Sequence, residues 1–315
     1  MKTMKWLIKR EMWENKGMLF WTPVVIASAV ALLVLTSLFL GKMTGFEMEG
    51  HNIGTVTIEG AARDHIAETL SQAYIGAGMP VLMVLGFLVF FYCLNALHDE
   101  RRDRSLLFWK SLPVSDFTTV MSKLLLAVVV APLITMGIAI VLGLVMLLAT
   151  CLLLLAHGTN LFGAILSSPE FYLTPLRLVG LLPVYVLWAL PTVGWLLMVS
   201  SMARSKVFLW AVGTPVIGSL LLLWAEKVLH FGFDAGWIAS HITNRILLGV
   251  VPGSWLVFCK DAIAIAHEEH KIALPDAIFN ASWSTLGGVS VWIGAAAGVA
   301  MIAIAVQMRR RREEV

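Results

Sequence analysis

The stretch LLLAVVVAPLITMGIAIVLGLVMLLATCLLLLA, residues 124–156, decides the class of fold because it contains no charged residue. A helix needs about 20 mostly apolar residues to span a bilayer, so this stretch predicts a membrane-spanning helix. Working outward along the chain, five further gaps between charged residues are long enough for a span: 17–41, 69–98, 178–203, 207–225 and 277–308.

The full uncharged gap around the quoted stretch, 124–169, allows two interpretations. As one helix it would be about 69 Å long at 1.5 Å per residue, against a hydrocarbon core of about 30 Å. The polar cluster His157-Gly158-Thr159-Asn160 comes late in the gap. This position favours one long helix that ends near Ala156, with 161–176 as an external loop or short surface helix.

Composition and charge placement agree with a multi-pass membrane protein. The 315 residues are 59% hydrophobic and 14% charged, whereas a soluble domain has about a quarter charged residues. The net charge of +3 is too small to indicate nucleic-acid binding. With six spans and both termini inside, 16 of the 23 Lys and Arg residues fall in inner segments, as the positive-inside rule requires.

We therefore predict an all-α integral membrane protein that forms a single transmembrane domain over residues 1–315. Its parts are an N-terminal amphipathic interface helix at 1–17, spans at about 18–40, 75–97, 122–156, 178–201, 206–225 and 284–307, a cytoplasmic coupling region at 98–120, and an external region at 226–283.

Three details refine this layout. Met4, Leu7, Ile8 and Met12 recur at helical spacing, which predicts an apolar face lying on the inner membrane surface. The uncharged stretch 246–259 is too short to span and contains Pro252-Gly253, which suits a re-entrant or interfacial helix. The GxxxG pair Gly294 and Gly298 predicts close helix approach, either within the subunit or in a dimer.

The segment after the second span has the densest charge, and it carries the functional prediction. ERRDRSLLFWKSLPVS, residues 100–115, is a charged turn that feeds a short aromatic helix and ends at a proline. A plain cytoplasmic loop anchored by a tryptophan at the headgroups explains the composition equally well. The order of the residues, however, resembles the cytoplasmic signature of ABC-2 type permeases.

The resemblance covers about 16 residues in motif and the whole chain in layout. One departure is Arg104-Ser105-Leu106, where many members carry Gly-Thr-Leu or Gly-Ser-Leu. Membership would imply a permease subunit of an ATP-driven exporter in a bacterial inner membrane. Two permease subunits, identical or different, would pair, and each would rest on a cytoplasmic ATP-binding subunit.

In that family the residues around Leu106–Leu112 form the coupling helix that seats in the ATPase. By this resemblance Glu100, Arg101 and Arg104 would form ion pairs across that contact or with the N-terminal helix. Leu106, Phe108 and Trp109 would be the apolar anchor, Lys110 would lie in the same contact, and Pro113 would end the helix.

The chain has no GxxxxGK[ST] phosphate loop, so we expect no ATPase activity of its own, with ATP and Mg bound by the partner subunit. No catalytic, metal or cofactor-binding residues are predicted in this chain. Membrane lipid is an expected partner and nucleic acid is not.

The uncharged spans argue against an ion-coupled transporter and suit an apolar or amphipathic cargo. Two alternatives stay open: a non-transporting sensor or assembly subunit that docks an ATPase, and an intramembrane lipid-modifying enzyme.

Overall fold

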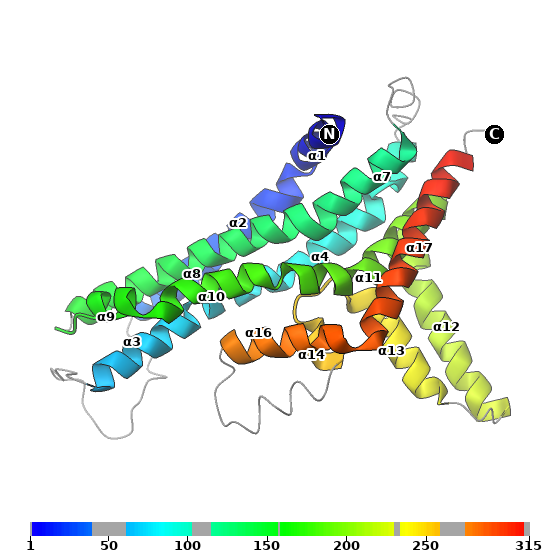
Figure 1. The fold of residues 1–315 in the computed structure, drawn as a ribbon. Coiled ribbons are helices and arrows are strands. Elements are labelled where there is room, and N and C mark those ends of the chain that lie inside the picture. The colour runs from blue at the N-terminus through cyan, green and yellow to red at the C-terminus, as the bar shows by residue number, and fades with distance from the viewer. Residues whose placement is uncertain are drawn as a thin grey trace.

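The computed structural model describes residues 2–39, 61–102, 115–156, 158–229, 234–258 and 275–311, and these residues form helices joined by turns. Six helices are long and apolar enough to cross a membrane, as the sequence predicted: Gly17–Ser37, His65–Glu100, Asp116–Ala156, Pro169–Met202, Val207–Val228 and Val289–Arg310. Both termini and the junction that leads into the third span lie at one end of the molecule (Figure 1).

The first half of the chain forms one tilted group of helices. It comprises α1 (Lys2–Glu14), a π-helical turn η1 (Gly17–Trp21), α2 (Thr22–Phe39), α3 (Ala61–Ala73), a 3-10 turn η3 (Tyr74–Gly78), α4 (Met79–Ala96), α5 (His98–Arg102), α7 (Asp116–Leu125), a π-helical turn η4 (Leu126–Val130) and α8 (Ala131–Ala156). The third span is one continuous helical stretch that ends at Ala156, which excludes two separate spans in this gap.

The second half begins with α9 (Phe162–Ser167), α10 (Pro169–Gly180), α11 (Leu182–Met202) and α12 (Val207–Leu229). It continues with α13 (Ala235–Leu248), α14 (Ser254–Phe258), α16 (Pro275–Ser284), a 3-10 turn η5 (Thr285–Gly287) and α17 (Val289–Arg311). The segment 161–176, expected as a loop or short surface helix, holds α9 and the start of α10, and α10 extends the fourth span outward.

Helix α11 forms the centre of the bundle and packs against α17, α4 and α13. Glycine makes the contact with α17 close, because a methyl group at Gly298 would lie 2.6 Å from the carbonyl oxygen of Leu190. A methyl group at Gly194 would lie 2.5 Å from the Gly298 carbonyl oxygen. The GxxxG glycine at 298 therefore serves packing within the subunit.

The region between the fifth and sixth spans folds back into the bundle. Helix α13 packs against α12 and α11, and the turn after it is made by Gly253 at a φ of 82°. The hydroxyl of Tyr185 on α11 donates to the Val250 carbonyl at 3.2 Å, and Val250 is buried. The uncharged stretch 246–258 thus lies against the spans, while 259–274 lie outside the described residues.

Helix α1 packs against α7, and it turns its apolar face toward the protein. Leu7 is buried, and Ile8 and Met12 pack against the main core. The place of α1 on the membrane surface stays a prediction, but at these residues the apolar face packs against the protein. The physical reason is a charged residue on the same face, Glu11, whose partner lies inside the bundle.

Candidate functional site

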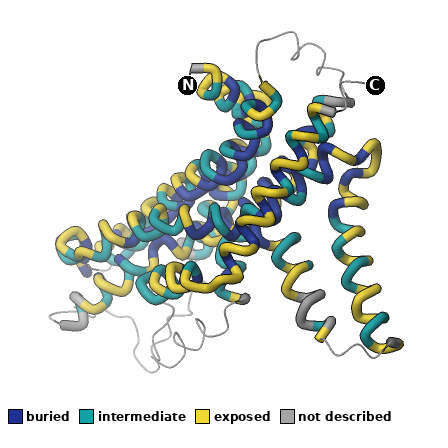
Figure 2. Tube along the Cα trace, turned by 45° about the vertical axis from the view of Figure 1, so that its right-hand side comes forward, coloured by how far each residue is buried: buried dark blue, intermediate teal, exposed yellow. Residues whose placement is uncertain are grey.

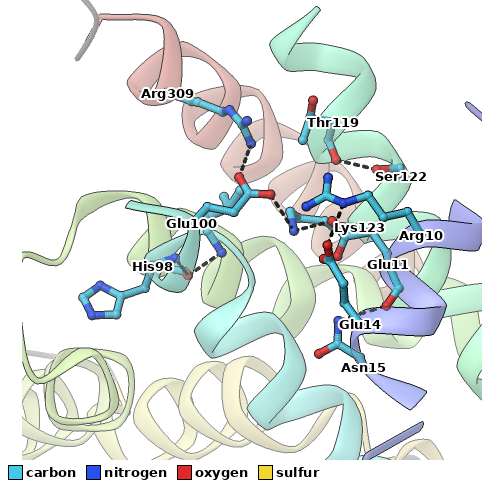
Figure 3. Close-up of polar contacts among 12 residues, drawn as sticks. Arg10, Glu11, Glu14, Asn15, His98, Glu100, Thr119, Ser122, Lys123 and Arg309 are labelled. Carbon is cyan, nitrogen blue, oxygen red and sulfur yellow. Dashed lines mark hydrogen bonds and ion pairs between the residues drawn. The ribbon is translucent and has the colours of Figure 1, made fainter. Parts of the chain in front are cut away.

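Five ionisable side chains meet at the end of the molecule where both termini lie. We call Glu11, Glu100, Asp116, Lys123 and Arg309 the charge network. They come from α1, α5, α7 and α17, four elements distant in sequence, and Figure 3 shows Glu100 between Lys123 and Arg309. Three carboxylates and two cations make the network one negative charge in excess.

Lys123 is the most enclosed cation of the network. Its Nζ donates to Glu11 Oε1 at 2.8 Å and lies 3.0 Å from Glu100 Oε1. The side chains of Lys123 and Glu11 are 3% and 2% exposed. An ammonium with so little contact with water needs partners, because desolvating an isolated charge costs several kcal/mol. The two carboxylates supply them.

Arg309, near the end of α17, joins two carboxylates that flank one segment of the chain. Its Nε donates to Asp116 Oδ1 at 2.9 Å, and its Nη1 lies 3.0 Å from Glu100 Oε2. Glu100 precedes residues 103–114 and Asp116 follows them. A single guanidinium of the last span therefore connects both ends of that segment.

Two hydroxyl groups make hydrogen bonds next to the charge network. The hydroxyl of Tyr92 on α4 donates to Glu11 Oε2 at 3.2 Å. Lys123 bonds to the other oxygen of this carboxylate, so both oxygens of Glu11 have a partner. The buried Ser200 hydroxyl of α11 accepts from the backbone N–H groups of Leu97 and His98, at 3.2 and 3.1 Å. These bonds satisfy backbone N–H groups at the start of α5, just after α4 ends.

The segment re-enters the fold through a capped helix start. The Ser115 side chain accepts from the Thr118 backbone N–H at 3.2 Å, and Asp116 lies in the first turn of α7. A serine N-cap followed by an acidic residue satisfies and complements the free N–H groups of a helix start. The direction of α7 is thus set locally at the point where Arg309 also contacts it.

The predicted coupling residues are only partly described. Glu100 joins the charge network, and the backbone of Arg101 lies in α5. Arg104, Leu106, Phe108, Trp109, Lys110 and Pro113 lie outside the described residues. The link between Glu100 and the N-terminal helix is indirect, because Lys123 lies between the carboxylates of Glu100 and Glu11.

Sequence reasoning missed Glu11, Asp116, Lys123 and Arg309 as members of one site. Two signals were present. Glu11 is an acidic residue four positions after Leu7 on an otherwise apolar helix face, and Lys123 directly precedes the longest apolar stretch. Neither signal names a partner, since Glu11 and Lys123 are 112 positions apart.

Another cation, Arg245, lies outside the charge network, between α11, α13 and α17. The Arg245 guanidinium is 4.7 Å from the centre of the Trp188 ring and donates to the carbonyls of Ser290 and Val291, at 2.6 and 3.2 Å. Gly294 leaves room for it, because a side chain at that position would collide with the guanidinium. Arg245 therefore ties α13 to the start of α17.

Comparison with protein-family models, curated proteins and solved structures finds no match for this chain. Within the described ranges there is also no group of three or more His, Cys, Asp or Glu side chains placed to hold a metal ion. The ion pairs of the charge network link α1, α5, α7 and α17.

Proposed function

We propose that this chain is the membrane-spanning permease subunit of an ATP-driven ABC exporter in a bacterial inner membrane. It pairs with a second permease subunit and rests on two copies of a cytoplasmic ATP-binding subunit that binds ATP and Mg. Its cargo is apolar or amphipathic, because the six spans contain long uncharged segments.

The observation that carries the proposal is the bridge made by Arg309. The segment that resembles a coupling helix is held at both ends, by Glu100 and by Asp116, on one guanidinium of the last span. Glu100 continues the connection through Lys123 to Glu11 on α1. A push on this segment by an ATPase would therefore move α1, α7 and α17 together.

The orientation follows from charge placement. The network lies at the end that holds both termini (Figure 1), and the inner segments carry most Lys and Arg residues of the chain. This end faces the cytoplasm in our proposal, where an ATPase is available. The region around α13 and α16 then faces outward, with α13 and its turn as a re-entrant hairpin.

The test co-expresses the full chain with a candidate ABC-type ATP-binding subunit and measures complex formation and ATP turnover. Trp109→Ala is expected to weaken the complex, because it removes an aromatic anchor. Arg309→Gln is expected to leave the complex intact but remove the effect of the permease on turnover. A coupling of about 1–3 kcal/mol corresponds to a change of roughly 5-fold or more.

The matched control is Arg310→Gln, which removes the same charge from the exposed neighbouring position. If the two arginine changes have equal effects on ATP turnover, the bridge made by Arg309 has no specific part in the coupling. If the wild-type chain binds no ATPase, the permease assignment fails. A stable complex whose turnover responds to no cargo would instead support the sensor or assembly subunit.

A further inference from the structure

The exposed side of α1 carries a regular pattern of cations and tryptophans. We call Lys5, Trp6, Lys9, Trp13 and Lys16 the cationic face of α1, although Lys16 lies just beyond the end of α1, before η1; all five are exposed. At 3.6 residues per turn they fall within an arc of about 100°. Trp6 and Trp13 are 69% and 62% exposed, which is unusual for the largest apolar side chain.

The pattern repeats after seven residues. Lys9 Nζ lies 5.5 Å from the centre of the Trp6 ring, and Lys16 Nζ lies 5.2 Å from that of Trp13. Each stack holds an ammonium group close to the helix surface by a cation–π interaction. The nearby Glu14 falls outside the arc and pairs with Arg10 at 2.6 Å. The cationic face therefore contains no acidic residue.

The opposite side of α1 fixes which way this face points. Leu7 is buried, and Glu11 is held by Lys123 and by the Tyr92 hydroxyl. Rotating the helix to bury the tryptophans would expose Leu7 and break both bonds to Glu11. The cationic face is thus presented outward by the charge network.

The cationic face continues into the outward surface of the first span. The backbone bonds Asn15 N–H to Glu11 and Leu19 N–H to Asn15 carry the helix from α1 into η1. Beyond them Phe20, Trp21 and Val25 are exposed on the span itself. An apolar surface of a spanning helix contacts acyl chains, so the cationic face begins where the headgroup layer should lie.

We propose that the cationic face of α1 binds the phosphate headgroups of anionic phospholipids in the cytoplasmic leaflet. Tryptophan sits at the headgroup depth, where its ring is amphipathic like its surroundings. Juxtamembrane lysines are attracted to anionic lipid within a Debye length of the surface. The phosphate headgroups would contact Lys9 and Lys16. This binding does not depend on whether the chain docks an ATPase.

The experiment reconstitutes the full chain in phosphatidylcholine vesicles that contain about a quarter phosphatidylglycerol, with brominated acyl chains on one lipid at a time. Bromine quenches nearby tryptophan, and the α1 signal is the difference between the chain with and without Trp6→Phe plus Trp13→Phe. Brominated phosphatidylglycerol is expected to quench this signal at least about threefold more, molecule for molecule, than brominated phosphatidylcholine.

The variant Lys9→Gln plus Lys16→Gln should abolish the preference, and so should about 0.5 M salt. Lys227→Gln, at an exposed position near the far end of α12, is the matched control and should retain it. Native mass spectrometry of the purified chain gives a second readout. The amount of phosphatidylglycerol retained per chain should fall at least about threefold in the double lysine variant and should not fall in Lys227→Gln.

Equal quenching by the two brominated lipids in the wild-type chain would overturn the proposal, since the face would then lack headgroup selectivity. Absence of quenching by either lipid would also overturn it and would indicate a protein partner on this face. Loss of ATPase binding in the separate co-expression test has no bearing on either result.

Discussion

Lys123 is the residue that holds the charge network together. Its ammonium lies between the carboxylates of Glu11 and Glu100, and it is 3% exposed. Buried ion pairs add little net stability compared with apolar residues, but removing one partner leaves a charge that water cannot reach. Removing this ammonium leaves Glu11 without a cation, whereas Glu100 keeps its ion pair with Arg309.

Replacing Lys123 by methionine keeps an unbranched side chain that is one atom shorter and removes the charge. We expect a loss of roughly 3–5 kcal/mol in the free energy of unfolding, since Glu11 and Glu100 lose their common partner. Thermal unfolding in detergent, followed by fluorescence, measures the change as a lower Tm. Lys227→Met, at an exposed site on α12, is the control and should leave Tm nearly unchanged.

A double change separates lost charge pairing from lost packing. Adding Glu11→Gln to Lys123→Met removes the carboxylate that lost its cation, while the ion pair of Glu100 with Arg309 remains. The double variant should therefore be more stable than Lys123→Met alone, a coupling that a mutant cycle measures. If the two destabilising effects simply add, the carboxylates do not depend on Lys123.

At the scale of elements, the tight contact between α11 and α17 depends on glycine. Gly298 faces the Leu190 carbonyl, and Gly194 faces the Gly298 carbonyl. The other glycine of the GxxxG pair, Gly294, accommodates the guanidinium of Arg245 instead. The same short motif thus serves one helix–helix contact and one side-chain contact.

Gly298→Ala is expected to destabilise the protein, although alanine is the better helix former by about 1 kcal/mol. The new methyl group would lie 2.6 Å from backbone atoms of Leu190, and these atoms cannot move without shifting α11. The matched control is Gly218→Ala on α12, where no heavy atom lies within 4 Å. Tm in detergent should fall for Gly298→Ala and hold or rise for Gly218→Ala; the reverse order would contradict the packing.

In contrast to α11, helix α12 buries little of its surface against the rest of the protein. It stands at the edge of the bundle and exposes large apolar residues along its length, including Phe208, Trp210, Leu221 and Trp224 (Figure 2). A surface of this kind is stable in a lipid environment, where exposed apolar side chains carry no hydration cost. Packing thus fixes α11 in the centre and leaves α12 outside.

For the whole molecule, the decisive property is its orientation in the membrane. The charge network, the start of α1, the end of α17 and the described residues on either side of the predicted coupling segment share one end, and our proposal places that end in the cytoplasm. Apart from the charge network, Arg177 pairs with Asp276 at 2.6 Å and so connects α10 to the start of α16.

Cysteine labelling tests this orientation. In a chain whose own cysteines at 93, 151 and 259 are replaced by alanine, single cysteines are placed at exposed Lys227 or Arg310. A membrane-impermeant maleimide should label position 227 in intact cells and position 310 only after permeabilisation. The opposite pattern would place the charge network outside and would leave no ATPase within its reach.

The six spans could be predicted from sequence alone because hydropathy is a local property. About 20 adjacent apolar residues make a helix cross a bilayer whatever its neighbours are. The long third helix and its end at Ala156 were predictable for the same reason. The boundaries of the second and fourth spans were underestimated, because α3 and α10 contain charged residues and still continue these helices.

The partners of the buried charges could not be predicted in this way. The sequence by itself determined that the protein is helical and that six of its helices are long and apolar enough to span a membrane. The tertiary structure alone decided that Glu11 meets Lys123, that Arg309 joins Glu100 to Asp116, and that the tryptophans of α1 face outward. Spanning depends on a sum over neighbouring residues, whereas ion pairing depends on which helices pack together and at what rotation.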